Sequence, residues 1–518
     1  MRCPPALDVA RLERLRLLLA LASGAGLAGA FAPHRIPLLV WVAPAALILS
    51  VLGARGATAW LAGFLHGIAF YLLTLPWIYT VLRVHGELAA AHAAALLGLM
   101  VAVLALFPAA LAWGVAWLDR RHRWRALLGA PLLWVALEFA RTHMPHIGFP
   151  WNLLGYALED EPVLRQLAAW TGIYGVSLLV AATNALLVWL VVEWRQRRVR
   201  VVAVAVLVLF LFIAQFGRAW VPTESPRALA HLVQPNLPQS TTGAADWYTR
   251  HAADLAELVR LSITVAGASP GLIVWPEVPA PFSLQDARFV GPAQTIARDS
   301  RSFFLIGVIE WRPTASGEMA AFNSAVLLDP TGQRVFTYDK IHLVPFGEYV
   351  PKRNWLGFAG PIVGGIGDFA RGSDYAVGRL PGGRFGVFIC YEAIFPNEVR
   401  RFVTGGAELL INLSNDGWFG RSAAPDQHLA MARFRAIENR RWLLRATNNG
   451  HTVVIDPYGR IRARLGTDVR GTLSAPFSFR SDSTLYARFG DWVAWLSLAA
   501  GLLLFVWPRP LRSGQRRN

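Results

Sequence analysis

Three hydrophobic segments of the chain each end in a residue that could do chemistry. Glu277 follows the first, Lys340 the second and Cys390 the third. Short runs of β-branched and aromatic residues such as these are typical of buried strands. Because the carboxyl ends of strands line the ligand crevice of an α/β sheet, we expect the three side chains to converge.

These three residue types suit acyl transfer. A thiol is a nucleophile, a carboxylate can accept its proton, and an ammonium group can stabilise the oxyanion that forms. The only lysines in the chain are Lys340 and Lys352, among 50 basic residues, so a lysine at a strand end is informative. A compact ammonium group fits a small oxyanion better than the planar guanidinium of arginine does. Taken singly, a buried cysteine, a solvated glutamate and a surface lysine all have ordinary structural explanations.

A different use of the thiol is also possible from the sequence. A cysteine–histidine site of the protease kind would need a base and an orienting partner, and the same region offers His342, His428, His451 and Asp416. Neither metal-ligand spacing nor a glycine-rich phosphate loop after a strand is found in the sequence, so we expect no metal and no cofactor. The two cysteines, Cys3 and Cys390, offer no disulfide framework.

The composition indicates a membrane protein. Of the 518 residues 54% are hydrophobic, and the mean hydropathy is +0.39. Eight apolar segments are long enough to be membrane spans: residues 17–32, 36–54, 57–82, 88–118, 124–142, 165–193, 199–219 and 489–507. The net charge of +17 is concentrated beside these segments, which argues against binding to nucleic acid.

The arginines beside the predicted spans predict an orientation. One side holds Arg2, Arg11, Arg14, Arg16, Arg55, Arg120, Arg121, Arg123, Arg125, Arg195, Arg197, Arg198, Arg200, Arg509, Arg512, Arg516 and Arg517. The loops of the opposite side hold only Arg35, Arg83, Arg141 and Arg165, beside the acidic residues 159–161. By the positive-inside rule, the arginine-rich side is cytoplasmic. Residues 222–486, with all three candidate residues, then lie outside the cytoplasm.

The pattern predicts a membrane domain over residues 1–221, an α/β domain over 222–486, and a last span with a cytoplasmic basic tail over 487–518. Strands are expected at 228–233, 272–274, 303–308, 324–328, 334–338, 385–389, 409–413, 443–446 and 451–455, and helices at 246–266, 291–299, 396–404 and 426–440. Residues 343–383 match neither pattern. They are rich in glycine and apolar residues, so we expect a mobile, membrane-facing lid there.

Several motifs around the three residues resemble the nitrilase, or carbon-nitrogen hydrolase, superfamily. They are Trp275-Pro276-Glu277, Tyr338-Asp339-Lys340, Cys390-Tyr391-Glu392 and Asn412-Leu413-Ser414-Asn415-Asp416-Gly417-Trp418-Phe419. With the spans, and with Phe149-Pro150-Trp151 and Pro345-Phe346-Gly347-Glu348-Tyr349, nearly the whole chain resembles the apolipoprotein N-acyltransferases, a membrane-embedded family of that superfamily. The resemblance implies an αββα sandwich with a Glu277-Lys340-Cys390 catalytic triad. It also implies supporting or substrate-binding roles for Glu348, Tyr391, Glu392, Trp247 and Phe419.

The resemblance further implies a reaction and a location. Cys390 would take an acyl group from a phospholipid as a thioester and pass it to the N-terminal amine of a diacylglyceryl apolipoprotein. The enzyme would lie in the inner membrane of a bacterium, with its catalytic domain facing the periplasm. Two alternatives stay open at this point: a membrane-tethered amidase or nitrilase that uses water as acceptor, and a transporter or scaffold with an inactive domain.

Overall fold

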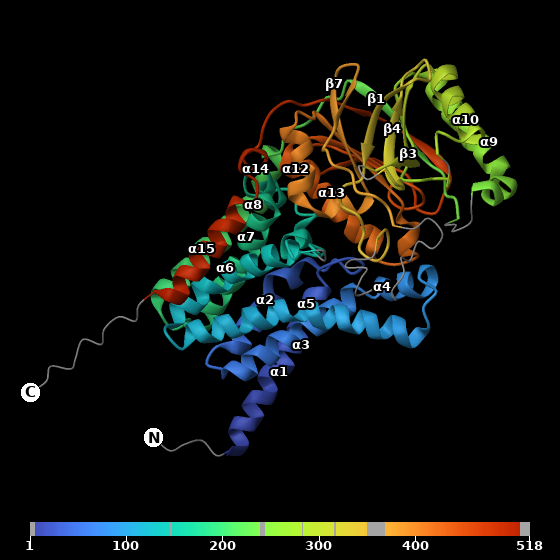
Figure 1. Ribbon diagram of the computed structural model, residues 1–518. Coiled ribbons are helices and arrows are strands. Elements are labelled where there is room, and N and C mark those ends of the chain that lie inside the picture. Colours follow the sequence, from blue (N-terminus) through green and yellow to red (C-terminus); the bar gives the residue numbers. More distant parts are fainter. Residues whose placement is uncertain are drawn as a thin grey trace, which may run out of the picture.

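The computed structural model describes residues 6–145, 148–238, 244–281, 283–314, 317–349 and 368–507. A bundle of helices forms one part of the molecule and an α/β domain the other, and the first helix begins and the last helix ends at the side of the bundle farthest from the α/β domain (Figure 1). The middle of the predicted lid, residues 350–367, lies outside the described residues, so the lid stays a prediction.

A helix is present at each position where the sequence predicts a span. These helices are α1 (Ala6–Ala28), α2 (Pro37–Val51), α3 (Gly56–Thr74), α5 (Ala90–Asp119), α6 (Arg123–Thr142), α7 (Ala168–Val192), α8 (Arg197–Phe216) and α15 (Trp492–Val506). Among the described residues, three helical stretches are long and apolar enough to cross a bilayer: Gly56–Thr74, Ala90–Asp119 and Leu164–Val192. Helices α2 and α15 are apolar but shorter. The chain is therefore a membrane protein, and eight crossings remain a prediction.

The third predicted span is too long at its C-terminal end. Helix α3 ends at Thr74, two residues before Pro76. It ends there because proline cannot continue the hydrogen bonding of a helix interior. Residues up to 85 form a separate short helix, α4 (Trp77–Thr80), and a π-helical turn, η1 (Val81–His85).

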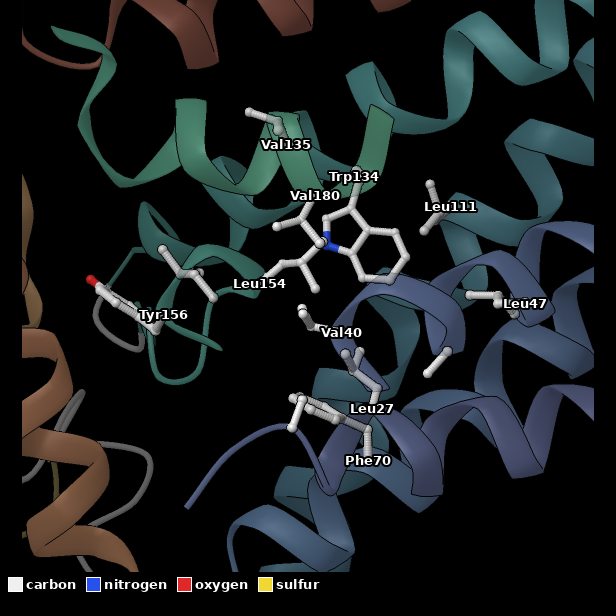
Figure 2. Close-up of a cluster of buried hydrophobic side chains, with 14 of the residues drawn as sticks. Leu27, Val40, Leu47, Phe70, Leu111, Trp134, Val135, Leu154, Tyr156 and Val180 are labelled. Atoms are coloured by element: carbon white, nitrogen blue, oxygen red, sulfur yellow. The ribbon is translucent and has the colours of Figure 1, made fainter. Parts of the chain in front are cut away.

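Small residues let the helices of the bundle approach one another closely. A Cβ added to Gly63 would lie 2.1 Å from the carbonyl oxygen of Pro108, and one added to Gly67 would lie 2.7 Å from the Cα of Ala105. Helices α3 and α5 therefore pack with their backbones nearly in contact, as small residues allow in membranes. Figure 2 shows the apolar cluster beside them, in which Trp134 points between Leu111 and Leu154.

Asn184 of α7 repairs a gap in the hydrogen bonding of α2. Pro44 lies inside α2 and has no N–H to donate. The Asn184 side chain donates from Nδ2 to the carbonyl oxygen of Val40 (3.0 Å), and its Oδ1 accepts from the N–H of Ala45 (2.8 Å). Water is not available to these backbone groups inside a bilayer, so the side-chain amide of Asn184 supplies the hydrogen bonds that they would otherwise lack.

The α/β domain contains two six-stranded mixed sheets. The first has the order β12-β1-β2-β3-β4-β5 and is built from β1 (Ala228–Gln234), β2 (Leu272–Val274), β3 (Phe303–Pro313), β4 (Met319–Leu328), β5 (Arg334–Asp339) and β12 (Gly471–Phe477). The second has the order β11-β10-β9-β8-β7-β6 and is built from β6 (Val377–Leu380), β7 (Gly383–Ile389), β8 (Leu409–Ser414), β9 (Trp442–Thr447), β10 (Val453–Ile455) and β11 (Ile461–Arg464). Strands β1, β2 and β3 run parallel, as do β7, β8 and β9.

The two sheets pack face to face and helices cover their outer faces. One core cluster combines Leu232 and Val274 of the first sheet with Val387 and Ile411 of the second. Helices α9 (Ala244–Ala268) and α10 (Ala287–Asp299) pack on the outside of the first sheet, and α12 (Pro396–Thr404) and α13 (Ala424–Asn439) pack beside the second. The predicted αββα sandwich is confirmed.

Candidate active site

Glu277 and Lys340 meet in the interior of the α/β domain. Lys340 Nζ lies 3.2 Å from Glu277 Oε1, and both side chains are almost wholly buried. Burial by itself would lower the pKa of Lys340, but the charges of Glu277 and Glu348 outweigh burial and raise it. Lys340 is therefore a fixed cation. Its backbone is fixed too, because its N–H donates to the carbonyl oxygen of Asn323 on β4 (2.8 Å).

A second carboxylate and an amide complete the surroundings of Lys340. Glu348 Oε1 accepts from Lys340 Nζ at 2.9 Å, and its Oε2 accepts from the N–H of Val344. The amide nitrogen of Asn323 donates to Glu277 (2.8 Å) and to Glu348 (2.9 Å). Asn323 was not predicted from the sequence, although it directly precedes the predicted strand 324–328. Strand pairing brings it opposite Lys340, and a single sequence carries no signal of that pairing.

The backbone around Glu277 is constrained. Val278 has a φ of +36°, which is unusual for a β-branched residue. A Cβ on Gly307 of β3 would lie 2.6 Å from the carbonyl oxygen of Pro276, so glycine is needed where this segment crosses β3. The N–H of Asn415 donates to Glu277 Oε2 at 3.0 Å. The carboxylate is thereby held at both oxygens.

Cys390 begins a 3₁₀ turn, η5 (Cys390–Ile394), directly after β7, and its φ is +48°. Such a φ is uncommon for residues other than glycine, asparagine and aspartate. It changes the direction in which the thiol points where the strand ends. Burial and the charge of Glu277 raise the pKa of the Cys390 thiol, while Lys340 opposes this shift. The thiol is therefore protonated at rest and needs a base in order to react.

Glu392 joins the turn at Cys390 to the segment at Lys340. Its Oε2 accepts from the N–H of Ile389 at 2.7 Å. Its Oε1 accepts from Tyr338 Oη (2.7 Å) and from the N–H groups of Ile341 and His342 (2.8 and 3.1 Å). Burial raises the pKa of Glu392 to about 7, although these donors favour its charged form. Glu392 thus caps its own turn and holds the backbone of the two residues after Lys340.

His428 lies beneath the same turn and does not act on the thiol. Its Nε2 lies 3.1 Å from the carbonyl oxygen of Cys390, and its Nδ1 lies 3.1 Å from Arg445 Nη2. A guanidinium group can only donate, so Nδ1 accepts and Nε2 carries the proton that bonds the carbonyl oxygen. The guanidinium group of Arg445 also pairs with Asp416 (2.9 Å). Burial would raise the pKa of Asp416, but the charge of Arg445 holds it below its usual range. This geometry does not fit a cysteine–histidine protease.

A cluster of aromatic side chains joins the region of the Cys390 turn to the helical bundle. The Trp151 ring lies 5.8 Å from the His428 ring and 6.0 Å from Phe419, and Phe419 lies 5.1 Å from Trp77. Trp151 Nε1 donates to Gln427 on α13 at 2.7 Å. Helix α13 lies between the sheets and the bundle (Figure 1). Phe419 is therefore part of the contact between the two parts of the molecule.

The two remaining predicted residues have clear positions. Tyr391 Oη donates to the carbonyl oxygen of Gly148 (3.4 Å), and its ring packs on Phe395. Trp247 is 2% exposed and lies in an apolar cluster with Leu237 and Ala280. Their contacts with substrate, like the roles of the other site residues, remain predictions.

Comparison with known proteins covers both parts of the molecule. The carbon-nitrogen hydrolase family model matches residues 230–481, and the model of the apolipoprotein N-acyltransferase N-terminal domain matches residues 23–186. An apolipoprotein N-acyltransferase of Geobacter metallireducens is 36% identical, with 96% of each chain covered. The chain belongs to the apolipoprotein N-acyltransferase family. A second member, from Pseudomonas syringae pv. tomato, is 35% identical over 95% of this chain and 96% of its own.

Solved structures also resemble part of this apolipoprotein N-acyltransferase family member. An amidase from Nesterenkonia has 19% sequence identity and a TM-score of 0.37, with 50% of this chain and 94% of that chain covered. Saccharomyces cerevisiae Nit3, of the nitrilase superfamily, has 19% identity and a TM-score of 0.38, with 57% and 98% covered.

Proposed function

We propose that the protein transfers an acyl group from a phospholipid to the N-terminal amine of a diacylglyceryl apolipoprotein, with Cys390 as the nucleophile. The observation that carries the proposal is the contact of Glu277 with Lys340 beside the Cys390 thiol, in a chain of the apolipoprotein N-acyltransferase family. Both substrates are lipids, and a bundle of apolar helices holds the α/β domain at the bilayer where they reside.

In the first half-reaction, Glu277 accepts the proton of the Cys390 thiol, and the sulfur attacks the ester carbonyl of the phospholipid. Lys340 and the backbone N–H of Tyr391 stabilise the oxyanion. The ester C–O bond then breaks, the lysophospholipid oxygen takes the proton from Glu277, and a thioester remains on Cys390. The raised pKa of the buried thiol is the reason that a base is required.

In the second half-reaction, the free amine of the acceptor attacks the thioester. Glu277 takes a proton from the amine nitrogen, the C–S bond breaks, and the proton returns to the sulfur of Cys390. Glu348 and Asn323 keep Lys340 and Glu277 in place through both steps. The proposed location is the bacterial inner membrane, with the α/β domain facing the periplasm, as the arginine distribution indicates.

Incubation of the purified protein with labelled phospholipid and a synthetic diacylglyceryl peptide tests the proposal. We expect acylated peptide, and a hydroxylamine-sensitive acyl adduct on Cys390 when the peptide is left out. Cys390→Ala should abolish both products, and Cys3→Ala is the matched control that should retain them. Free fatty acid as the main product would instead indicate a hydrolase, and absence of any product would indicate an inactive scaffold.

A further inference from the structure

A polar cavity of about 120 Å³ lies in the α/β domain, at the edge of the second sheet opposite the catalytic residues. Its polar lining comprises Arg384, Arg441, Thr404, Ser481, Ser483 and Glu408. Arg384 stands at the start of β7, whereas Cys390 follows the end of the same strand. The cavity is therefore separate from the candidate active site, and nothing in the proposed reaction uses it.

Arg441 is a buried cation that the cavity holds rigidly. Only 3% of the residue is exposed, its Nε donates to the carbonyl oxygen of Ala407 (2.8 Å), and its Nη1 donates to that of Asp482 (2.7 Å). The nearest carboxylate oxygen in an ion pair with it, from the half-exposed Asp482, lies 3.8 Å away. Burial lowers the pKa of Arg441 to about 10, so its charge is incompletely compensated.

Arg384 supplies a second cation at the mouth. Its guanidinium group lies directly on Gly406, where φ is +101° and an added Cβ would be 2.6 Å from Nη1. Glu408, the one carboxylate in the lining, has an oxygen 4.0 Å from Arg384 Nε. Arg384 and Arg441 thus stand 4.0 and 3.8 Å from their carboxylate partners, Glu408 and Asp482, and this loose pairing favours an anionic ligand that also accepts hydrogen bonds.

One side of the cavity lies close in the chain to the last apolar helix. Ala487 of α14 (Leu485–Phe489) lines it, and only Gly490 and Asp491 separate α14 from the apolar helix α15. Leu485 and Phe489 expose 44% and 66% of their surface beside it.

The tryptophans nearby support the same position. Trp492 Nε1 donates to the carbonyl oxygen of Trp170, and Trp170 and Trp495 are largely exposed. Tryptophan is favoured at the boundary between hydrocarbon and water, which supports a position of the start of α15, and of α14 before it, near lipid head groups.

We propose that this cavity binds the phosphate group of an anionic phospholipid, such as phosphatidylglycerol, as a docking site apart from catalysis. Arg441 and Arg384 contact the phosphate oxygens, and the hydroxyl group of Ser481 donates to the phosphate. The hydroxyl groups of Ser483 and Thr404 already donate to the carbonyl oxygens of Thr484 and Arg401, so they accept from head-group hydroxyls. The exposed Leu485 and Phe489 insert among the acyl chains. Binding there holds the α/β domain against the bilayer through α14 and α12.

The full chain, reconstituted in phosphatidylcholine vesicles, allows a direct test with spin-labelled lipids. We expect spin-labelled phosphatidylglycerol to associate more strongly than spin-labelled phosphatidylcholine. Arg384→Gln should reduce that preference about fivefold, as expected for one basic residue near an anionic head group. Ser483→Asp, which places a negative charge in the mouth, should reduce it at least as much. Acyl transfer in detergent should stay unchanged in both variants.

Arg260→Gln is the matched control, because Arg260 is an exposed arginine paired with a glutamate on the outer helix α9. It should leave the lipid preference unchanged. Equal preference in wild type and in both cavity variants would overturn the proposal, as would an equal loss in Arg260→Gln. Added inorganic phosphate distinguishes the two sources of the ligand. If millimolar phosphate abolishes the preference, the site takes free phosphate and the lipid assignment is wrong. A preference that persists supports the lipid.

Discussion

At Cys390 the backbone holds a φ of +48°, and the carbonyl oxygen of the same residue accepts from the buried His428. A strained φ persists only where the surrounding structure holds it. At Cys390 the hydrogen bond from His428, on helix α13, is one such restraint. His428 is therefore a positioning residue for the turn, while Glu277 and Lys340 face the thiol itself. Mutation of His428 should change the turn without removing any proposed reacting group.

His428→Leu should slow acyl-enzyme formation and make the thiol more reactive. Loss of a hydrogen bond to a buried carbonyl costs about 1–3 kcal/mol, which corresponds to roughly tenfold to a hundredfold in rate. Because burial raises the pKa of Cys390, alkylation of the wild-type thiol by iodoacetamide should be slow at neutral pH. Its rate should still increase with pH above about 8.5, where the rate of an ordinary cysteine levels off. In His428→Leu the turn relaxes toward solvent, so alkylation at pH 7 should increase while acyl transfer falls.

His428→Gln is the control, since its amide can donate from nearly the same position as Nε2 and should restore both measurements in part. If alkylation and acyl transfer fell together in His428→Leu, in step with a lower melting temperature, the residue would serve stability only.

Lys340→Arg should keep the charge and lose most of the activity. Lys340 is 1% exposed and fits between carboxylate oxygens at 3.2 and 2.9 Å, so the larger planar guanidinium group cannot take the same position. Loss of one oxyanion donor costs on the order of 10² to 10³ in rate. Steady-state acyl transfer measures the loss, and Lys352→Arg is the matched control at the only other lysine. Near-normal turnover in Lys340→Arg would remove the oxyanion role.

At the scale of elements, local pattern alone could predict the strands that carry the site. Strands β2 and β7 are short and almost wholly buried, whereas β5 buries only Tyr338. Lys340 and Cys390 directly follow β5 and β7, and Glu277 follows β2 after Trp275 and Pro276. Strands β6, β11 and β12 were missed. Strand β12 begins with three half-buried residues and contains Pro476, and it becomes a strand because it pairs with β1 along its whole length. Asn323 and His428 were not assigned to the site for the same reason, because tertiary pairing decides what they contact.

The repair of α2 by Asn184 is another contact between elements, and it should be necessary for stability. Asn184→Leu keeps a similar volume but leaves the carbonyl oxygen of Val40 and the N–H of Ala45 without their partner, at about 1–3 kcal/mol for each buried group. The melting temperature in detergent should fall by several degrees. Thr183→Val is the matched control, since Thr183 bonds only within its own helix, to Leu179. Equal melting temperatures for the two variants would contradict the repair.

For the whole molecule, the distribution of charge and the position of the ends lead to the same orientation. The start of α1 and the end of α15 lie at the side of the bundle away from the α/β domain (Figure 1), and the arginine-rich turn before α8 lies between helices that run from that side. Arginine in short loops is retained in the cytoplasm. The α/β domain, with its paired charges and modest net charge, carries no such constraint and can be exported.

We therefore predict that the α/β domain lies outside the cytoplasm, and single cysteines can test it. In a background of Cys3→Ser and Cys390→Ser, Arg421→Cys places a thiol where the native side chain is 93% exposed, in the α/β domain. Arg195→Cys places one at the arginine-rich turn before α8. A membrane-impermeant maleimide should label position 421 in intact spheroplasts and position 195 only after the membrane is opened. The acceptor substrate must reach the thioester from the side on which its lipid anchor resides. The opposite labelling pattern would therefore overturn both the orientation and a periplasmic site of acyl transfer.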